Sequence, residues 1–265
     1  MTSSARLRRA GLQRVGERLS DRDWALTRDV ARFRVMTGRQ LQLLHVGASE
    51  TDARTTRRIL SRLTSERVLA RLPRQVGGIH AGSSGQVVAL GPVGDRLLSD
   101  GRPRRRARDV SDGFLDHTLA VADLYVSLRL AEQRGHLTLR QVDSEPQCWR
   151  RLDALGAGDW LKPDLHVVLS TGDEQLHSYV ELDRGTEHRP ALLRKLRLYE
   201  DAYRSGSASD PGDIFPRVIW LVPSEPRAAL IRQLVARTAG LTAELHAVGL
   251  HAAALPLLKG GDRGL

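Results

Sequence analysis

Three acidic residues are the best candidates for chemistry in this sequence. Asp164 stands in the stretch Lys162-Pro163-Asp164, and Glu181-Leu182-Asp183 follows 17 residues later. Each stretch borders or enters an apolar run that predicts a short buried strand. Strand alternation places Glu181 and Asp183 on one face, so Asp164 on a neighbouring strand would complete a pocket of three carboxylates. Oxygen ligands in that number suit Mg²⁺ or Mn²⁺, the metals of phosphodiester chemistry.

A structural alternative stands beside this metal pocket. A buried carboxylate is costly unless a cation or strong hydrogen-bond donors compensate it. In the alternative, Asp164 caps a turn and the other two acids pair with Arg184 or Arg189 at a strand end. Acidic clusters of that kind also occur in purely structural ion-pair networks. The residue pattern by itself leaves both alternatives open.

The charge of the 265-residue chain is unevenly distributed. Residues 1–110 hold 23 Lys and Arg against 10 Asp and Glu, a balance of +13, whereas residues 111–265 hold 18 against 21, a balance of −3. A basic module joined to a mildly acidic one is typical of a DNA-docking domain with an effector domain. The alternative is an arginine excess that reflects coding bias only.

Three helices are predicted in succession in the basic part. Ser20 and Asp23 form a capping pair at the start of the first helix, and Thr37 is the N-cap of a short second one. The third helix is predicted from Thr51 to about Glu66. Its apolar residues fall on one side and its basic residues largely on the other.

A β-hairpin is predicted next, with strands over 68–72 and 86–90 around a tip rich in Gly and Ser. Three helices followed by a hairpin predict a winged helix-turn-helix, whose third helix enters the major groove of DNA. The predicted DNA-binding residues are Arg54, Thr55, Arg57, Arg58 and Arg62 on that helix, with Arg74 and Gln75 on the wing. The competing hypothesis is a winged-helix module that binds protein.

The acidic part predicts a mixed sheet flanked by helices. The expected helices cover residues 116–132, 190–203 and 227–238, and the expected strands lie near 137–142, at the two acidic stretches, at 217–222 and at 244–248. The predicted organisation is a basic N-terminal tail over 1–18, the winged-helix domain over 19–100, an arginine-rich linker over 101–110, a second domain over 111–254 and a C-terminal tail over 255–265. The fold class is therefore α+β or α/β.

Composition excludes several classes of protein. A single cysteine, Cys148, excludes an intramolecular disulfide and a cysteine-based zinc cluster. No apolar run approaches the roughly 20 residues of a membrane helix, and no hydrophobic stretch follows the basic N-terminus, so we expect a cytoplasmic protein without membrane partners. No phosphate-binding glycine loop with Lys and Ser or Thr is present, which argues against ATP-driven activity.

The arrangement resembles the PD-(D/E)XK phosphodiesterase superfamily, with Pro163-Asp164 as its first acidic motif and Glu181-Leu182-Asp183 as its second. More narrowly, the chain is similar to the actinobacterial branch of the replication-relaxation family, which serves plasmids and other mobile elements. The matching stretches are Leu19–Asp23, Leu41–Leu44, Asp116–Val121, Lys162–Asp164, Glu181–Glu187 and Lys195–Tyr199. The resemblance covers about residues 19–250. It implies an N-terminal winged helix and a nuclease-like C-terminal domain.

One departure from the superfamily concerns its catalytic lysine. The second motif usually ends in lysine, which orients or deprotonates the attacking water, and this chain has Asp183 there. Three interpretations follow from the resemblance. Lys195 on the next helix takes over the lysine's task, with Tyr199 one turn further on; or Asp183 is a third metal ligand; or the site is degenerate. Weaker candidates for the pocket are Glu187, His117 and His166.

The resemblance implies a metal-dependent endonuclease or nickase that acts in replication or transfer of a mobile element. In that hypothesis Asp164, Glu181 and Asp183 hold Mg²⁺ or Mn²⁺, and Lys195 adds fixed positive charge. The second hypothesis is a non-catalytic DNA-binding accessory or transcriptional regulator whose nuclease-like domain serves assembly. Double-stranded DNA is the expected partner in both. A homodimer and contacts with replication or transfer proteins are further expectations.

Overall fold

The computed structural model describes residues 3–72, 86–99, 112–152, 160–171, 174–206 and 214–261. The chain divides into two compact units, Met1–Val126 and Ser127–Leu265, which are described separately. None of the helices in the described ranges is long and apolar enough to cross a membrane. The predicted linker over 101–110 lies outside the described residues, as does the wing tip with Arg74 and Gln75.

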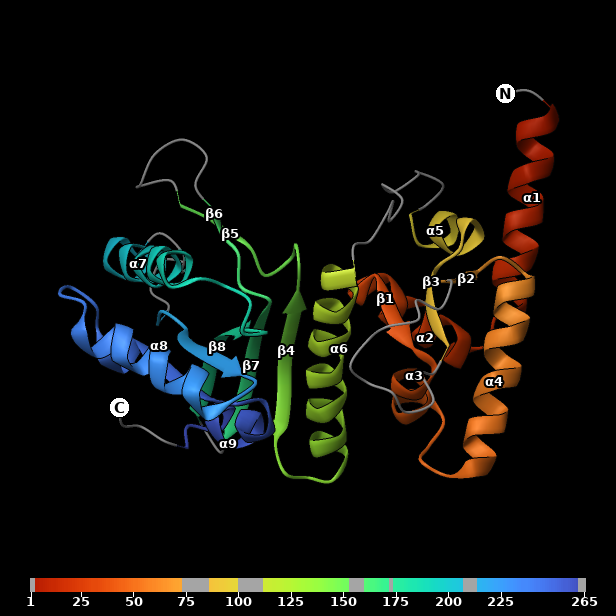
Figure 1. The fold of residues 1–265 in the computed structure, drawn as a ribbon. Helices are drawn as coiled ribbons and strands as arrows, with labels where there is room; N and C mark the ends of the chain where they lie inside the picture. The colour runs from red at the N-terminus through yellow and green to blue at the C-terminus, as the bar shows by residue number, and fades with distance from the viewer. Residues whose placement is uncertain are drawn as a thin grey trace. The chain divides into compact units, whose positions relative to one another are not determined.

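The first unit combines helices with a small antiparallel sheet of strand order β1-β3-β2 (Figure 1). Its elements are α1 (Ser3–Arg18), α2 (Asp21–Phe33), β1 (Val35–Thr37), α3 (Gly38–His45), α4 (Glu50–Ser65), β2 (Leu69–Arg71), β3 (Val87–Leu90), α5 (Pro92–Leu98) and the first half of α6 (Asp112–Gln133). The predicted hairpin is confirmed, because β2 and β3 pair antiparallel. Helix α5 begins directly after the hairpin.

Capping boxes begin the three central helices of this unit. The side chain of each N-cap accepts from the backbone of the residue three positions on, and that residue's side chain accepts from the N-cap backbone. The pairs are Ser20 with Asp23, Thr37 with Gln40 and Ser49 with Asp52. The first two caps are those predicted. The third prediction, a start at Thr51, was wrong because Ser49 provides the Asp52 cap two residues earlier.

Two elements of the first unit were not predicted. Residues 1–18 were expected to form only a basic tail, yet α1 spans most of them, and its Gly16 approaches Leu97 of α5 closely. Closely spaced arginines hide the apolar period of this helix. Strand β1 has three residues, too few to show alternation, and it adds to the hairpin by pairing with β3.

The first half of α6 packs within the first unit. The Gln40 amide donates to the Leu119 carbonyl at 2.9 Å and to the Asp123 carboxylate at 2.7 Å. The rings of Phe33 and Tyr125 lie 4.9 Å apart. Sequence analysis placed this whole helix at the start of the second domain, because apolar residues surround it and do not indicate which neighbour it covers.

The second unit contains a five-stranded mixed sheet of order β10-β9-β8-β7-β4. The first three strands of that order are parallel, and β7 and β4 are antiparallel to their neighbours. In chain order, the helices and strands of this unit after α6 are β4 (Thr138–Ser144), β5 (Arg150–Arg151), β6 (Trp160–Leu161), β7 (Leu165–Thr171), β8 (Glu174–Leu182), α7 (Arg189–Ser205), β9 (Arg217–Val222), α8 (Glu225–Arg237), β10 (His246–Leu250) and α9 (Ala254–Leu258). The predicted α+β class is confirmed, whereas β5 and β6 were not predicted.

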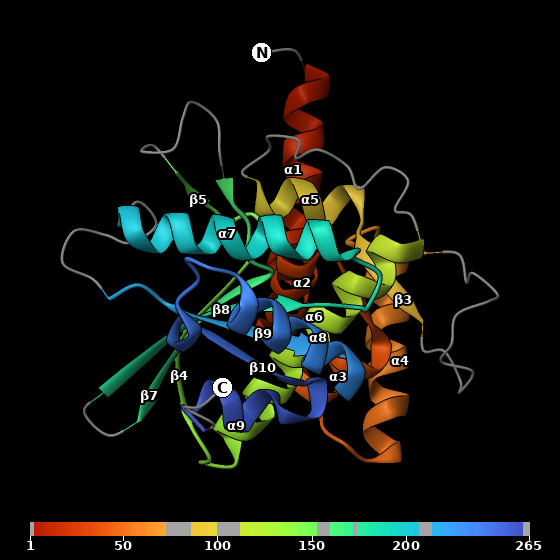
Figure 2. The same cartoon turned by 60° about the vertical axis from the view of Figure 1, so that its left-hand side comes forward.

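Helices α7 and α8 cover one face of this sheet (Figure 2). Tyr179 of β8 and Trp220 of β9 pack there in one buried cluster with Leu196 and Tyr199 of α7 and with side chains of α8. Helix α9 packs on β9 and β10, so residues 255–258 are not the loose tail that was expected. Burial of Leu257 and Leu258 holds this short helix in place.

The register of three strands positions the acidic residues. Ser144 of β4 pairs with Leu165 of β7, and Leu165 pairs with Val180 of β8. One position further along this register, each of the three strands has an acidic residue. These residues are Glu145 just after β4, Asp164 just before β7 and Glu181 near the end of β8.

Candidate functional site

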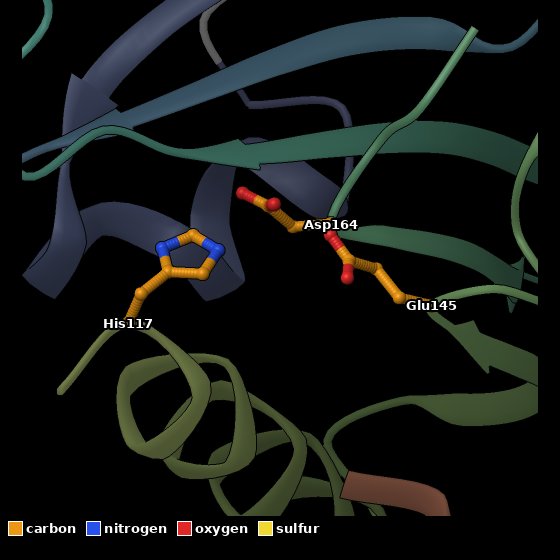
Figure 3. Close-up of side chains that lie close together, drawn as sticks. All are labelled: His117, Glu145 and Asp164. Carbon is orange, nitrogen blue, oxygen red and sulfur yellow. The ribbon is translucent and has the colours of Figure 1, made fainter. Parts of the chain in front are cut away.

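Glu145, Asp164 and Glu181 occupy one row across β4, β7 and β8, one position beyond the Ser144–Leu165–Val180 row. A carboxylate oxygen of Glu145 lies within 4.8 Å of one of Asp164 (Figure 3). Like charges directly opposite each other on a sheet destabilise it. A cation close to the row would offset this repulsion.

Backbone groups fix Asp164. Its amide donates to the Val180 carbonyl at 3.0 Å, and its Oδ2 accepts from the Leu182 amide at 2.7 Å. The side chain is buried. These contacts hold the carboxylate beside the carboxyl-terminal end of β8 and leave it little rotational freedom.

Glu181 is held by two residues of α7. The Tyr199 hydroxyl donates to Oε1 of Glu181 at 2.5 Å, and the Nζ of Lys195 lies 2.6 Å from Oε2. Lys195 and Tyr199 are four residues apart and share one face of the helix. The Lys195 ammonium is also 3.7 Å from Oε1 of Glu187. Glu181 is 1% exposed, whereas the Lys195 side chain is 31% exposed, so the ammonium links a buried carboxylate to solvent.

Burial is the largest influence on the pKa values of Glu181, Lys195 and Tyr199. It raises the pKa of Glu181 to about 7; Lys195 opposes the shift and Asp164 adds to it. Burial alone would lower the pKa of Lys195, but the carboxylates of Glu181, Asp164 and Glu187 raise it above its ordinary value. Burial and the neighbouring Glu181 also raise the pKa of Tyr199. At neutral pH Lys195 is therefore a cation and Tyr199 a hydrogen-bond donor.

Asp183 lies apart from this row. It follows the end of β8, and its Oδ1 accepts from the Gly185 amide at 2.6 Å. Its Oδ2 accepts from Nε of Arg227 on α8 at 2.5 Å, and Nη2 of Arg227 donates to the Glu187 carbonyl at 2.8 Å. These contacts fasten the β8–α7 loop to α8. Among the described residues, no set with ligand atoms all within 4.8 Å joins Asp183 to Asp164 and Glu181, and none joins Glu181 to Glu145 and Asp164.

Sequence analysis missed Glu145 and Arg227. Glu145 precedes a proline just after a strand and resembles a turn residue, although the antiparallel register, once counted, places it beside Asp164. Arg227 was noted only as the start of a helix. Neither residue carries a local motif, and only the pairing of distant segments gives them a role.

His166 and His117, the two histidines considered for the site, give weaker support for catalysis than the acidic residues do. His166 shares the face of Asp164 and is buried, with its ring 5.2 Å from that of Tyr179 and 5.9 Å from that of His177. Burial lowers the pKa of His166 to about 4, which makes it a neutral packing residue at neutral pH. His117, also labelled in Figure 3, lies on the half of α6 that belongs to the first unit.

The arginines of α4 divide into two groups. Arg54, Arg57, Arg58 and Arg62 are all exposed, but Nη2 of Arg62 also lies 2.6 Å from Oδ1 of the buried Asp23. Burial raises the pKa of Asp23, but hydrogen bonds from Arg62 and from Ser20 reverse that effect and lower it below its ordinary value. Arg62 therefore has a structural role within the unit. Thr55 is half-buried on the same helix.

Comparison with known proteins decides the family. The family model described as replication-relaxation matches residues 28–218. The chain belongs to the replication-relaxation family. No curated protein and no solved structure gave a match.

The match extends over both units of this replication-relaxation protein. It begins within α2 and ends within β9, so it includes α4, the acidic row and Lys195, but not Arg227. Membership indicates a role in the replication of plasmids or other mobile elements.

Proposed function

We propose that this protein is a metal-dependent DNA phosphodiesterase, an endonuclease or nickase, that acts during replication or transfer of a mobile element. One observation carries the proposal. Glu145, Asp164 and Glu181 lie in one row across three strands, and the Lys195 ammonium is 2.6 Å from Glu181. Clustered carboxylates with an adjacent ammonium are the groups that phosphodiester hydrolysis needs.

The donor set fits a hard divalent cation. Glu145 and Asp164 bring carboxylate oxygens within 4.8 Å of each other, a separation that one Mg²⁺ or Mn²⁺ can bridge. Glu145 is half-buried, so its carboxylate is accessible from solvent. A cation bound there would lower the pKa of a water molecule and offset negative charge on the phosphate.

The protein's own groups supply orientation and charge. Tyr199 fixes the rotamer of Glu181, and Glu181 in turn holds the Lys195 ammonium beside the acidic row. That ammonium stabilises negative charge as it develops on the attacked phosphate. Lys195 thereby takes over the task of the lysine that Asp183 replaces. Asp183 supports the site indirectly, because its bond to Arg227 anchors the loop that carries Glu187.

Helix α4 is the proposed DNA-docking surface of the first unit. Arg54, Arg57 and Arg58 are exposed on it, and it follows α3 as a recognition helix does in a winged helix-turn-helix. Cations at that position bind phosphates and guanine edges.

A second candidate function is DNA binding without catalysis. It is favoured by Glu181, whose two oxygens already contact Tyr199 and Lys195. In that case the acidic unit would serve assembly only.

Nicking of supercoiled plasmid separates the two functions. The assay compares wild type, Asp164→Asn and the control Glu174→Gln, which changes an exposed acid on the same strand as Glu181. Asparagine still accepts from the Leu182 amide, so the variant should fold. Nicking with Mg²⁺ or Mn²⁺ that is lost only in Asp164→Asn supports the enzyme. Nicking by none of the proteins, with DNA still bound, supports the binding protein.

A further inference from the structure

Two described segments of chain, one after Glu145 and one before Asp164, form an arm whose two ends meet at the acidic row. The arm comprises residues 146–152 and 160–163, and its strands β5 and β6 pair antiparallel. The Cys148 thiol donates to the Pro163 carbonyl at 2.9 Å and so ties the two ends together. Burial raises the pKa of Cys148, which keeps this thiol protonated as a donor. The base of the arm is thus fixed beside Asp164.

The arm presents aromatic rings together with cations. The Trp160 side chain is 43% exposed, and the exposed Arg151 pairs with it across the two strands. Nζ of Lys162 lies 5.0 Å from the ring centre of Trp149. With Arg150, the described part of the arm carries three cations and no carboxylate. Asp153 and Asp159 lie outside the described residues.

The chain length limits how far the exposed ring can be from the acidic row. Trp160 and Asp164 are four positions apart, so their Cα atoms are at most about 14 Å apart even if the chain is fully extended. A single exposed tryptophan is common on protein surfaces. Here the ring is combined with cations a few positions along the chain from carboxylates that suit a phosphate-bound metal, and this combination indicates a ligand with flat faces and negative charge.

We propose that this arm binds an unpaired DNA strand next to the phosphate to be cut. A base stacks on Trp160, and Arg151 and Lys162 contact the backbone phosphates. Base faces are accessible in single strands and hidden within a duplex, so stacking on one protruding ring selects the unpaired strand. The inference rests on the proposed function for the identity of the substrate, and it narrows that substrate to DNA with a melted or single-stranded segment.

Fluorescence anisotropy of the full-length protein tests the arm. A short fluorescein-labelled oligothymidylate and a labelled blunt-ended duplex of two strands serve as probes, with EDTA present so that binding is measured without cleavage. Trp160→Ala should weaken oligothymidylate binding about tenfold, because stacking on an aromatic side chain contributes on that scale. Trp160→Phe should stay within about threefold of wild type, since it keeps a ring for stacking. Duplex binding should be unchanged in both variants.

Tyr203→Ala is the matched control. Tyr203 is also 43% exposed in the same unit, but it packs edge-on against Phe215 at the end of α7. Its replacement should leave oligothymidylate affinity at the wild-type value. Equal affinity of wild type and Trp160→Ala for oligothymidylate would overturn the proposal, as would an equal loss on duplex. Because no metal is needed, selective loss with Trp160→Ala would support the arm even if plasmid nicking were absent.

Discussion

The Lys195 ammonium lies 2.6 Å from a carboxylate oxygen of Glu181, although the two residues are 14 positions apart and belong to different elements. The position two residues after Glu181, where a lysine would complete the motif on the strand, holds Asp183. The structure thus brings an ammonium to the acidic row from α7 instead of from β8.

Lys195→Ala should abolish most catalysis without unfolding the protein. Loss of one preorganised charge at a reacting phosphate lowers the rate by about 10²–10³-fold. The side chain is 31% exposed, and Glu181 can bind a proton once the cation is gone. Nicking rates of Lys195→Ala and of Arg194→Ala, an exposed neighbour on α7, provide the comparison. Equal rates in the two variants would exclude Lys195 from the mechanism.

Glu181 should make stability depend on pH in a defined direction. Its pKa in the folded protein is raised to about 7 from an ordinary value of 4.5, so the folded state binds the proton more tightly than the unfolded state. This contribution is fully present below about pH 4.5 and is lost as pH rises through about 7. Urea unfolding of wild type and Glu181→Gln should show the variant gaining stability relative to wild type between those limits. A difference that stays constant across this range would contradict the raised pKa.

Arg227→Met should destabilise the protein strongly. Asp183 is buried, and removal of its cation leaves an uncompensated charge, which costs about 3–5 kcal/mol. The double variant with Asp183→Leu should lose less, because the unpaired charge is then absent. A double-mutant cycle by urea unfolding measures this coupling. Purely additive losses would show that the two side chains act independently.

Replacement of the exposed Arg57 or Arg58 on α4 should weaken DNA binding and leave the stability of the fold unchanged. Arg57→Ala and Arg58→Ala should each weaken duplex affinity and reduce its salt dependence, because each would remove one of the proposed phosphate contacts. Arg62→Ala should instead lower stability by about 1–3 kcal/mol, since Oδ1 of the buried Asp23 loses the guanidinium while Oδ2 keeps its bonds from Ser20. Duplex titrations at several salt concentrations, with thermal unfolding of the same variants, separate the two effects. Unchanged isotherms for Arg57→Ala and Arg58→Ala would reject α4 as the docking helix.

The sequence predicted the elements that have strong local signals. The caps at Ser20 and Thr37 pair with residues three positions on, and the strand over 217–222 is a continuous apolar run bounded as predicted. Glu145 could not be assigned in this way, because its place beside Asp164 depends on the register between β4 and β7. The spacing of Arg62 placed it on the predicted DNA-binding face of the helix. Its hydrogen bond to Asp23, 39 residues earlier in the chain, could not be predicted from that spacing. Long-range pairing, rather than propensity, determines these roles.

The most direct test of the acidic row is plasmid nicking by Glu145→Gln, because the structure alone assigns this residue to the site. Wild type, Glu145→Gln, Asp164→Asn and the control Glu174→Gln are compared across Mg²⁺ concentrations on supercoiled plasmid. We expect wild type and Glu174→Gln to nick the plasmid, and Glu145→Gln and Asp164→Asn to require more metal or to be inactive. Glu145→Gln with wild-type activity at every metal concentration would contradict the proposed site.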